Sequence, residues 1–179
     1  IIPASGADDL QQKVLQSLAL MGAPEARVIF VNHLDHADTL YRQYAAEGLA
    51  RLRAPDLAPT ISKARITEDK ASVQAALSFA LYQSGREEYL LELVNGLLDS
   101  RRDQVAGYLR ELTPEQTRQL YPYLQSRDDD VREQVALAIG YTADASALPE
   151  LEKMFRDPDA DVVSAVNLSV RRLRARTSP

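Results

Sequence analysis

A repeat of about thirty residues constrains the fold of this chain more than any other feature of its sequence. A small or aliphatic residue recurs at intervals of 31, 31, 29, 30 and 31 residues, at Val14, Ala45, Ala76, Val105, Val135 and Val166. Four positions later the residue is apolar in every repeat: Leu18, Leu49, Ala80, Leu109, Ile139 and Val170. A spacing of four places both residues on one face of a helix. The repeat therefore predicts helical layers that stack and share a continuous apolar core.

The residues between these positions favour helices, and helix breakers divide them into segments. Apolar side chains follow the helical period, for example at Leu10, Val14, Leu18 and Met21, and no segment alternates as a strand does. Prolines and glycines near residues 22–24, 55, 85 and 158 end one helix or begin the next. The first helices of five pairs are expected at 8–21, 38–52, 69–84, 100–112 and 129–142, the second helices at 24–34, 56–65, 86–98, 114–125 and 145–156, and a final helix at 159–175.

Two segments resemble a known repeat family. The sequence from Asp129 to Gly140, Asp-Asp-Val-Arg-Glu-Gln-Val-Ala-Leu-Ala-Ile-Gly, resembles the first helix of a short bacterial HEAT repeat of the bilin-lyase type. The sequence Asp-Pro-Asp-Ala-Asp-Val at 157–162 resembles the turn between such repeats. We therefore expect an all-α, right-handed α-solenoid of stacked antiparallel helix pairs, the alpha-alpha superhelix of armadillo-like folds.

The domain organisation follows from the extent of the repeats. Residues 8–179 are expected to form one repeat domain of five helix pairs and a terminal helix, preceded by a linker at 1–7. Because the chain starts at Ile1 and not at Met, we interpret it as part of a larger protein. The valines at 162, 163 and 166 are expected to pack inward in the last helix or to meet another chain.

The family resemblance also implies where a partner binds. In HEAT-like stacks the second helices line the concave face, which commonly receives ligands, and turn aspartates pair with helix arginines along the stack. Only Arg42, Arg102 and Arg132 occupy the arginine position here, so we expect an incomplete ladder. The expected partner contacts combine charge with tyrosine, which is enriched at binding hot spots but also borders many cores. They are Lys63, Arg86, Glu88, Tyr89, Arg118, Tyr121, Glu150 and Lys153.

Candidate chemical sites have simpler structural interpretations. His33 and His36 fall near a predicted turn, and a tight metal site would need three or four converging ligands. The acidic clusters at 128–130 and 157–161 are expected to cap helices. The arginines at 171, 172, 174 and 176 suit the end of a helix, with binding of phosphate, a membrane surface or an acidic partner as the alternative. We therefore expect no catalytic residues, metal or cofactor. The His-Glu dipeptides with which some HEAT-like hydroxylases bind iron do not occur in this sequence.

Composition narrows the classes of function. The net charge of −5 argues against a nucleic-acid partner. The chain has no cysteine, and its apolar runs are too short to span a bilayer. The compartment stays open, with the cytoplasm favoured over a periplasmic or membrane-tethered parent. The sequence thus favours a non-catalytic scaffold, not an enzyme, that binds a protein or peptide. The alternative is an accessory subunit or lyase-like enzyme domain acting on a bound cofactor or chromophore.

Overall fold

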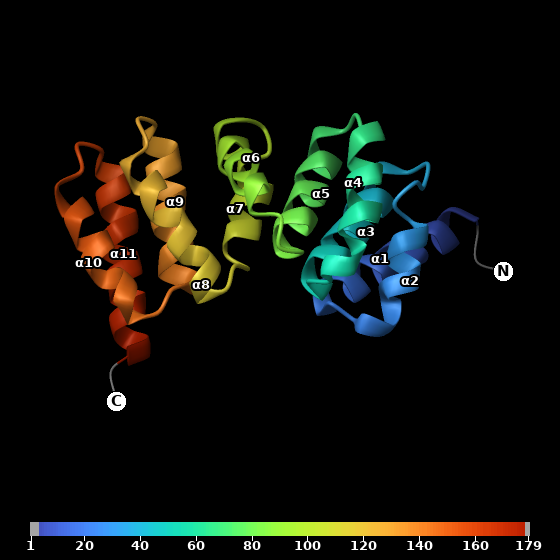
Figure 1. Cartoon of the computed structure of the whole chain (residues 1–179), viewed down its shortest axis with the longest axis horizontal. Coiled ribbons are helices and arrows are strands. Elements are labelled where there is room, and N and C mark those ends of the chain that lie inside the picture. The colour runs from blue at the N-terminus through green and yellow to red at the C-terminus, as the bar shows by residue number, and fades with distance from the viewer. Residues whose placement is uncertain (1–3, 178–179) are drawn as a thin grey trace. The chain divides into compact units, whose positions relative to one another are not determined.

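The computed structural model describes the backbone of residues 4–177 and the side chains of residues 8–176 (Figure 1). Within this range the chain forms eleven α-helices joined by turns and short 3₁₀ segments, and no strand. No helix of the described range is both long and apolar enough to cross a bilayer. The helices divide into two compact units, Ile1–Leu93 and Val94–Pro179. The chain therefore has an all-α helical-repeat fold, with antiparallel helix pairs stacked in each unit.

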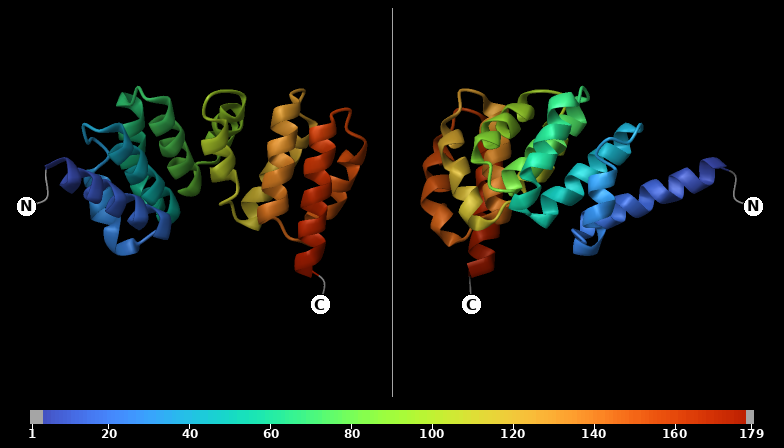
Figure 2. Two further views of the ribbon diagram at one scale, coloured as in Figure 1. Left: turned by 180° about the vertical axis from the view of Figure 1, so that it is seen from behind. Right: turned by 45° about the vertical axis from the view of Figure 1, so that its right-hand side comes forward.

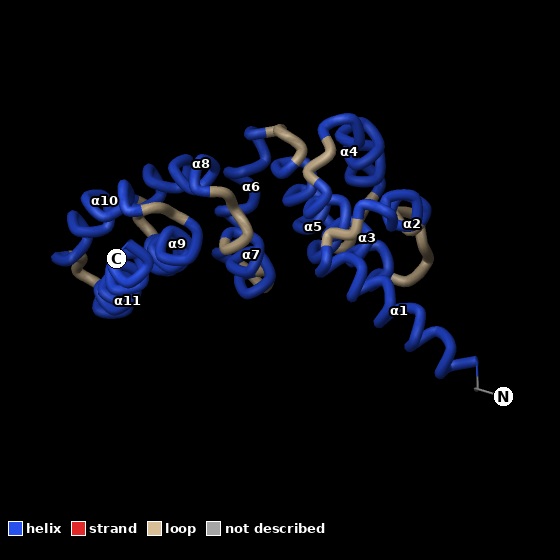
Figure 3. Tube along the Cα trace, turned by 90° about the horizontal axis from the view of Figure 1, so that it is seen from below, coloured by secondary structure: helices blue, strands red, loops and turns tan. Residues whose placement is uncertain are grey.

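The first unit contains two complete helix pairs and one further first helix. The first helices α1 (Ala4–Met21), α3 (Thr39–Leu52) and α5 (Ala71–Gln83) pack in sequence order, so that α3 contacts both of the others. The second helices α2 (Arg27–Asn32) and α4 (Ala58–Thr67) lie on one side of this row (Figure 3). Helix α6 (Leu90–Asn95) crosses the boundary between the two units.

The second unit repeats this arrangement with shorter second helices. The first helices are α7 (Arg102–Leu109), α9 (Asp129–Thr142) and α11 (Ala160–Thr177). The second helices are α8 (Pro114–Thr117) and α10 (Leu148–Glu152), which continue as 3₁₀ segments over Arg118–Gln125 and Lys153–Arg156. The predicted helix at 114–125 is thus α-helical only in its first turn. Pro122 lies inside this 3₁₀ segment, and because proline lacks an N–H it cannot donate a main-chain hydrogen bond there.

The predicted repeat seam is confirmed in five of its six members. Ala45, Ala76, Val105, Val135 and Val166 are completely buried. The residues four positions later in the same repeats are also buried, Val170 being the most exposed at 3%. The periodicity therefore located the core between layers correctly.

The expectation that Val14 faces inward is wrong. Val14 is 50% exposed, and Leu10 and Met21 on the same stripe are exposed as well. Helix α1 instead buries Leu15 and Ala19. In the first unit α1 has a neighbouring first helix, α3, on one side only. Its periodic stripe lies on the other side, and periodicity alone does not distinguish the two faces.

The expected linker is also corrected in part. Helix α1 begins at Ala4, so residues 4–7 are helical, whereas residues 1–3 lie outside the described range. Alanines at positions 4 and 7 have the highest helix propensity and favour extension of the helix backward from residue 8.

Aspartates and a threonine cap the helices as the sequence predicts. The Asp128 carboxylate accepts the Val131 N–H at the start of α9, and Asp159 accepts the Asp161 and Val162 N–H groups at the start of α11. Thr113 and Gln116 form the predicted capping box, with each side chain accepting the other residue's backbone N–H. The acidic clusters therefore begin helices, as expected.

Candidate functional site

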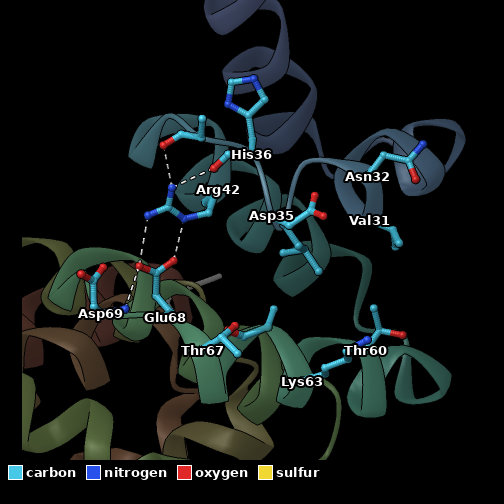
Figure 4. A pocket seen from close by; sticks show the side chains of 13 residues that line it. Val31, Asn32, Asp35, His36, Arg42, Thr60, Lys63, Thr67, Glu68 and Asp69 are labelled. Carbon is cyan, nitrogen blue, oxygen red and sulfur yellow. Dashed lines mark hydrogen bonds and ion pairs between the residues drawn. The ribbon is translucent and has the colours of Figure 1, made fainter.

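A groove opens between the two second helices of the first unit (Figure 4). It has a volume of 720 Å³, within the range typical of ligand sites. One wall is the end of α2 with the following turn, including Asn32, Asp35 and His36. The opposite wall is α4, which contributes Thr60, Lys63 and Thr67, and the turn after it.

An ion pair forms the floor of this groove. The Arg42 guanidinium donates from Nε to one oxygen of Glu68 at 2.7 Å and from Nη2 to the other at 3.2 Å. Its remaining nitrogen donates to the carbonyl oxygens of His36 and Ala37. Glu68 also accepts the N–H groups of Asp69 and Lys70. The pair thus joins the turn before α3 to the turn after α4.

The charge balance of the floor favours its ionised state. Burial alone would raise the pKa of Glu68, but the hydrogen bonds from Arg42 and from the backbone N–H groups outweigh it, so its pKa lies below the ordinary value. The hydrogen bond to Glu68 likewise raises the pKa of Arg42. Both groups are fully engaged with each other and with the backbone, so the floor serves as a support.

The walls of the groove carry exposed charges. Among the residues that the structure describes, neither Lys63 nor Asp35 has an ion-pair partner, and both side chains are exposed. Asp69 is exposed too and lies 3.4 Å from the Lys70 ammonium. The groove therefore offers separated positive and negative groups, together with two threonines and an asparagine. Such an arrangement suits the polar side chains and backbone of a polypeptide.

The two histidines belong to an aromatic stack. The rings of His36 and Tyr41 lie 4.2 Å apart, and the His33 ring lies 5.6 Å from His36. Nδ1 of His33 donates to the Ile29 carbonyl oxygen, and Nδ1 of His36 accepts the Asp38 N–H. Within residues 8–176, no three His, Asp or Glu side chains are grouped closely enough to hold a metal ion.

Of the predicted contact residues in the first unit, only Lys63 lies in the groove. Arg86 and Glu88 form an exposed ion pair with each other at 2.7 Å on the 3₁₀ segment before α6. The Tyr89 ring lies under the Arg65 guanidinium at 5.2 Å, and Arg65 in turn pairs with Glu92. These three residues therefore lie on a separate patch of the first unit, and much of their charge is already neutralised.

The predicted residues of the second unit form one polar surface. Arg118 pairs with Asp144 at 3.2 Å, and Asp144 also accepts the Ser146 N–H. Burial raises the pKa of Tyr121, and the Asp144 and Glu150 carboxylates raise it further, whereas Ser146 and Arg118 lower it. Glu150 binds Lys153 at 2.7 Å on α10 and the 3₁₀ segment after it. The sequence thus identified neighbours here, but all their charges have partners.

The terminal arginines act within the second unit. Arg176 donates to the carbonyl oxygens of Gly140, Tyr141 and Ala143 at the end of α9. The Arg172 guanidinium lies 4.1 Å from the centre of the Tyr141 ring, and Arg174 pairs with Glu152. The predicted complement to a helix dipole is therefore present, although the helix served is α9 and not α11 itself.

Sequence reasoning did not identify the groove itself. The sequence indicates a turn around His36, a repeated arginine at Arg42 and a contact residue at Lys63, but it does not bring them together. The groove exists because a turn and a helix from different pairs meet in the folded chain. One signal was available: a carboxylate follows the repeated arginine after 26 residues at Glu68 and after 25 at Asp157. That spacing marks the turns that the arginines join.

Comparison with known proteins gives only distant structural similarity. No protein-family model and no curated protein matches the chain. An engineered protein of known structure aligns with a TM-score of 0.42 and 17% identity, over 93% of this chain and 91% of that one. A designed armadillo repeat protein aligns with a TM-score of 0.40 and 14% identity, over 90% and 92% of the two chains. Human deoxyhypusine hydroxylase, in complex with glycerol, aligns with a TM-score of 0.41 and 17% identity, over 93% and 80%.

Proposed function

We propose that this chain is a non-catalytic scaffold of the HEAT type that binds a protein or peptide segment in the groove between α2 and α4. The contrast between floor and walls carries the proposal. Arg42 and Glu68 neutralise each other on the floor, whereas Lys63 and Asp35 on the walls have no ion-pair partner in the described part of the chain. Exposed charges on opposite walls of one groove provide specificity and fix the register of an incoming chain.

The charges also indicate the chemistry of the segment. Asp35 carries a negative charge without an ion-pair partner among the described residues, and α2 and α4 both end at the groove, where their carbonyl groups carry partial negative charge. The chain as a whole has a charge of −5. A segment with a basic side chain directed to Asp35 and an acidic or amide side chain near Lys63 fits this pattern best.

Two equivalent ion pairs support the HEAT assignment. Arg132 binds Asp157 through Nε at 2.8 Å and Nη2 at 2.9 Å, and donates to the Ser126 and Arg127 carbonyl oxygens. Arg42 makes the same set of contacts with Glu68 and its own turn. Such pairs between a helix arginine and the next turn are typical of the family that the sequence resembles.

Selection from a random peptide library tests the proposal. Peptides that bind the full chain are isolated, and their dissociation constants are measured for the wild type, Lys63→Glu, Asp35→Lys and Lys153→Glu. Lys153 is the matched control, because it is an exposed lysine on a second-helix segment of the other unit. We expect the two groove variants to weaken binding at least about tenfold and the control to change it by less than about twofold.

The conservative variant Lys63→Arg keeps the charge and should retain binding. The groove proposal would be contradicted by peptides that bind both groove variants normally but lose affinity for Lys153→Glu, since the second unit would then hold the site. A library that yields no binder above background would count against the scaffold function itself.

The enzyme alternative has its own test. An accessory subunit or lyase-like domain would carry a chromophore or another cofactor after purification. An absorption band in the visible region, or a bound metal found by mass spectrometry of the native protein, would favour that alternative over the scaffold.

A further inference from the structure

The outer face of α1 is an exposed apolar stripe at one end of the first unit. Leu10, Val14 and Met21 are 56%, 50% and 69% exposed, and Ser17 is exposed between them. Hollows of 450 and 310 Å³ run along this stripe, the larger reaching Ile29 of α2. Figure 2 shows α1 in blue at the edge of the first unit, with α3 on its other side.

The same side-chain pattern occurs in α11, where it is buried. Counted from the repeat positions Val14 and Val166, the stripe Leu10-Val14-Ser17-Leu18-Met21 corresponds to Val162-Val166-Ser169-Val170-Leu173. Every residue of the α11 set is at most 3% exposed, because this face packs against α9 and α10. Serine occupies the same place in both stripes, and the Ser169 hydroxyl donates to the Ala136 carbonyl oxygen of α9 at 2.8 Å.

The opposite faces of the two helices differ. Helix α11 exposes Asn167 and Arg171, which give it the polar outer face of a terminal layer. At the corresponding positions α1 has Leu15 and Ala19, which are buried toward the rest of the unit. Helix α1 is therefore apolar on two faces, as a helix between two layers is, whereas α11 is apolar on one.

We propose that the outer face of α1 binds a further helix pair with the chemistry of α9 and α10. The stripe needs a first helix with small residues opposite Ser17, as Ala136 and Gly140 are opposite Ser169. It also needs an aliphatic second helix, as α10 provides with Leu151. The interface continues the seam already present between α1 and α3, so the added pair extends the same stack. This surface is separate from the α2–α4 groove and does not depend on it.

A fusion protein with a thiol probe tests the proposal. A copy of residues 129–159 replaces residues 1–7, so that Asp159 of the copy precedes Asp8 as it precedes Ala160 in α11. The copy carries Val131→Gln and Val135→Gln, which give its new outer face polar residues. Because the chain has no cysteine, Ser17→Cys introduces a single thiol in both the parent and the fusion. The rate of its reaction with a maleimide reports whether the stripe is covered.

We expect the thiol of Ser17→Cys to react rapidly in the parent and on the order of 100-fold more slowly in the fusion, where reaction requires local opening. Leu20→Cys is the control: Leu20 is 63% exposed, lies off the stripe and should react rapidly in both proteins. Ser169→Cys in the parent supplies the reference for a buried seam.

Three outcomes would overturn the proposal. In the first, the thiol of Ser17→Cys reacts equally fast in parent and fusion. In the second, the added residues do not increase the helical circular dichroism, so the stripe has failed to support a layer. In the third, this thiol is already protected in a parent that sediments as a dimer, which makes a second copy of the chain the occupant.

Discussion

At the residue scale, three helical glycines differ in how closely another helix approaches them. A Cβ atom at Gly48 would lie 2.5 Å from the Phe30 ring, and one at Gly140 would lie 2.7 Å from the Ser169 Cα. Gly107 has no such neighbour within 4 Å. Two of the glycines therefore permit contact between layers, whereas Gly107 only adds backbone freedom to α7.

Alanine substitutions should separate these roles. We expect Gly107→Ala to raise the free energy of unfolding by about 0.5–1 kcal/mol, because alanine has the higher helix propensity. Gly48→Ala and Gly140→Ala should lower it by about 1–3 kcal/mol through overpacking, with Gly140→Ala the more severe because a backbone atom must move. Urea unfolding followed by circular dichroism measures all three. If Gly140→Ala stabilises the protein, then α9 and α11 do not approach each other as closely at this position as the 2.7 Å distance requires.

At the scale of elements, the arginine ladder joins successive layers through their turns. Its buried pair in the second unit is Arg132 with Asp157, whose side chains are 11% and 3% exposed. Arg102 departs from the pattern and binds Asp130 and Glu133. The residue 25 positions after Arg102 is Arg127, which cannot accept its guanidinium, and the residue at 26 positions is Asp128, whose carboxylate accepts the Val131 N–H as the cap of α9.

Removing the carboxylate charge should test the ladder directly. Asp157→Asn leaves the mostly buried Arg132 without its counter-charge, and we expect a loss of about 3 kcal/mol in the free energy of unfolding. Asp9→Asn removes an exposed partner of Lys13 and should change it by less than about 0.5 kcal/mol. Equal effects of the two substitutions in urea unfolding would contradict a stabilising role for the Arg132–Asp157 pair.

The same pair should make stability depend on pH. The hydrogen bond from Arg132 holds the pKa of Asp157 below its ordinary value, and burial opposes this only in part. The unfolded chain therefore binds a proton at a pH where the folded chain does not. The stabilisation is complete above the unfolded pKa of about 3.9 and is lost as the pH falls through the folded value. Between pH 2 and 7, the free energy of unfolding should depend less steeply on pH for Asp157→Asn than for the wild type. If the two proteins show the same dependence on pH, other groups cause the loss of stability in acid.

The positions of several helices were predictable because capping residues and helix breakers flank them. The predicted bounds of α9, 129–142, agree with Asp129–Thr142, where Asp128 caps the start. The second helices were less predictable. Segments such as 86–98 and 145–156 contain one or two turns of α-helix between 3₁₀ turns, and the hydrophobic period does not separate the two helix types.

At the scale of the whole molecule, periodicity identifies the seam between layers but not which of its positions lack a neighbour. Val14 and Val166 occupy the same place in the repeat, yet one is half exposed and the other completely buried. Periodicity does not predict the groove either, because Lys63 and Asp35 come to line one groove only when two helix pairs stack. Local sequence thus predicts layers well and predicts surfaces between layers poorly.

The difference between the two end helices leads to a paired prediction. Leu173 and Met21 are corresponding residues, 1% and 69% exposed. Leu173→Ala should lower the free energy of unfolding by about 2–5 kcal/mol, since it leaves a cavity beside α9 and α10. Met21→Ala removes a side chain that is mostly in water and should change it by less than about 0.5 kcal/mol. Both substitutions place alanine in a helix, so helix propensity does not separate them. A large loss for Met21→Ala in urea unfolding would show that the α1 stripe is already covered in solution. Sedimentation of the wild type as a dimer would then identify a second copy of the chain as its neighbour.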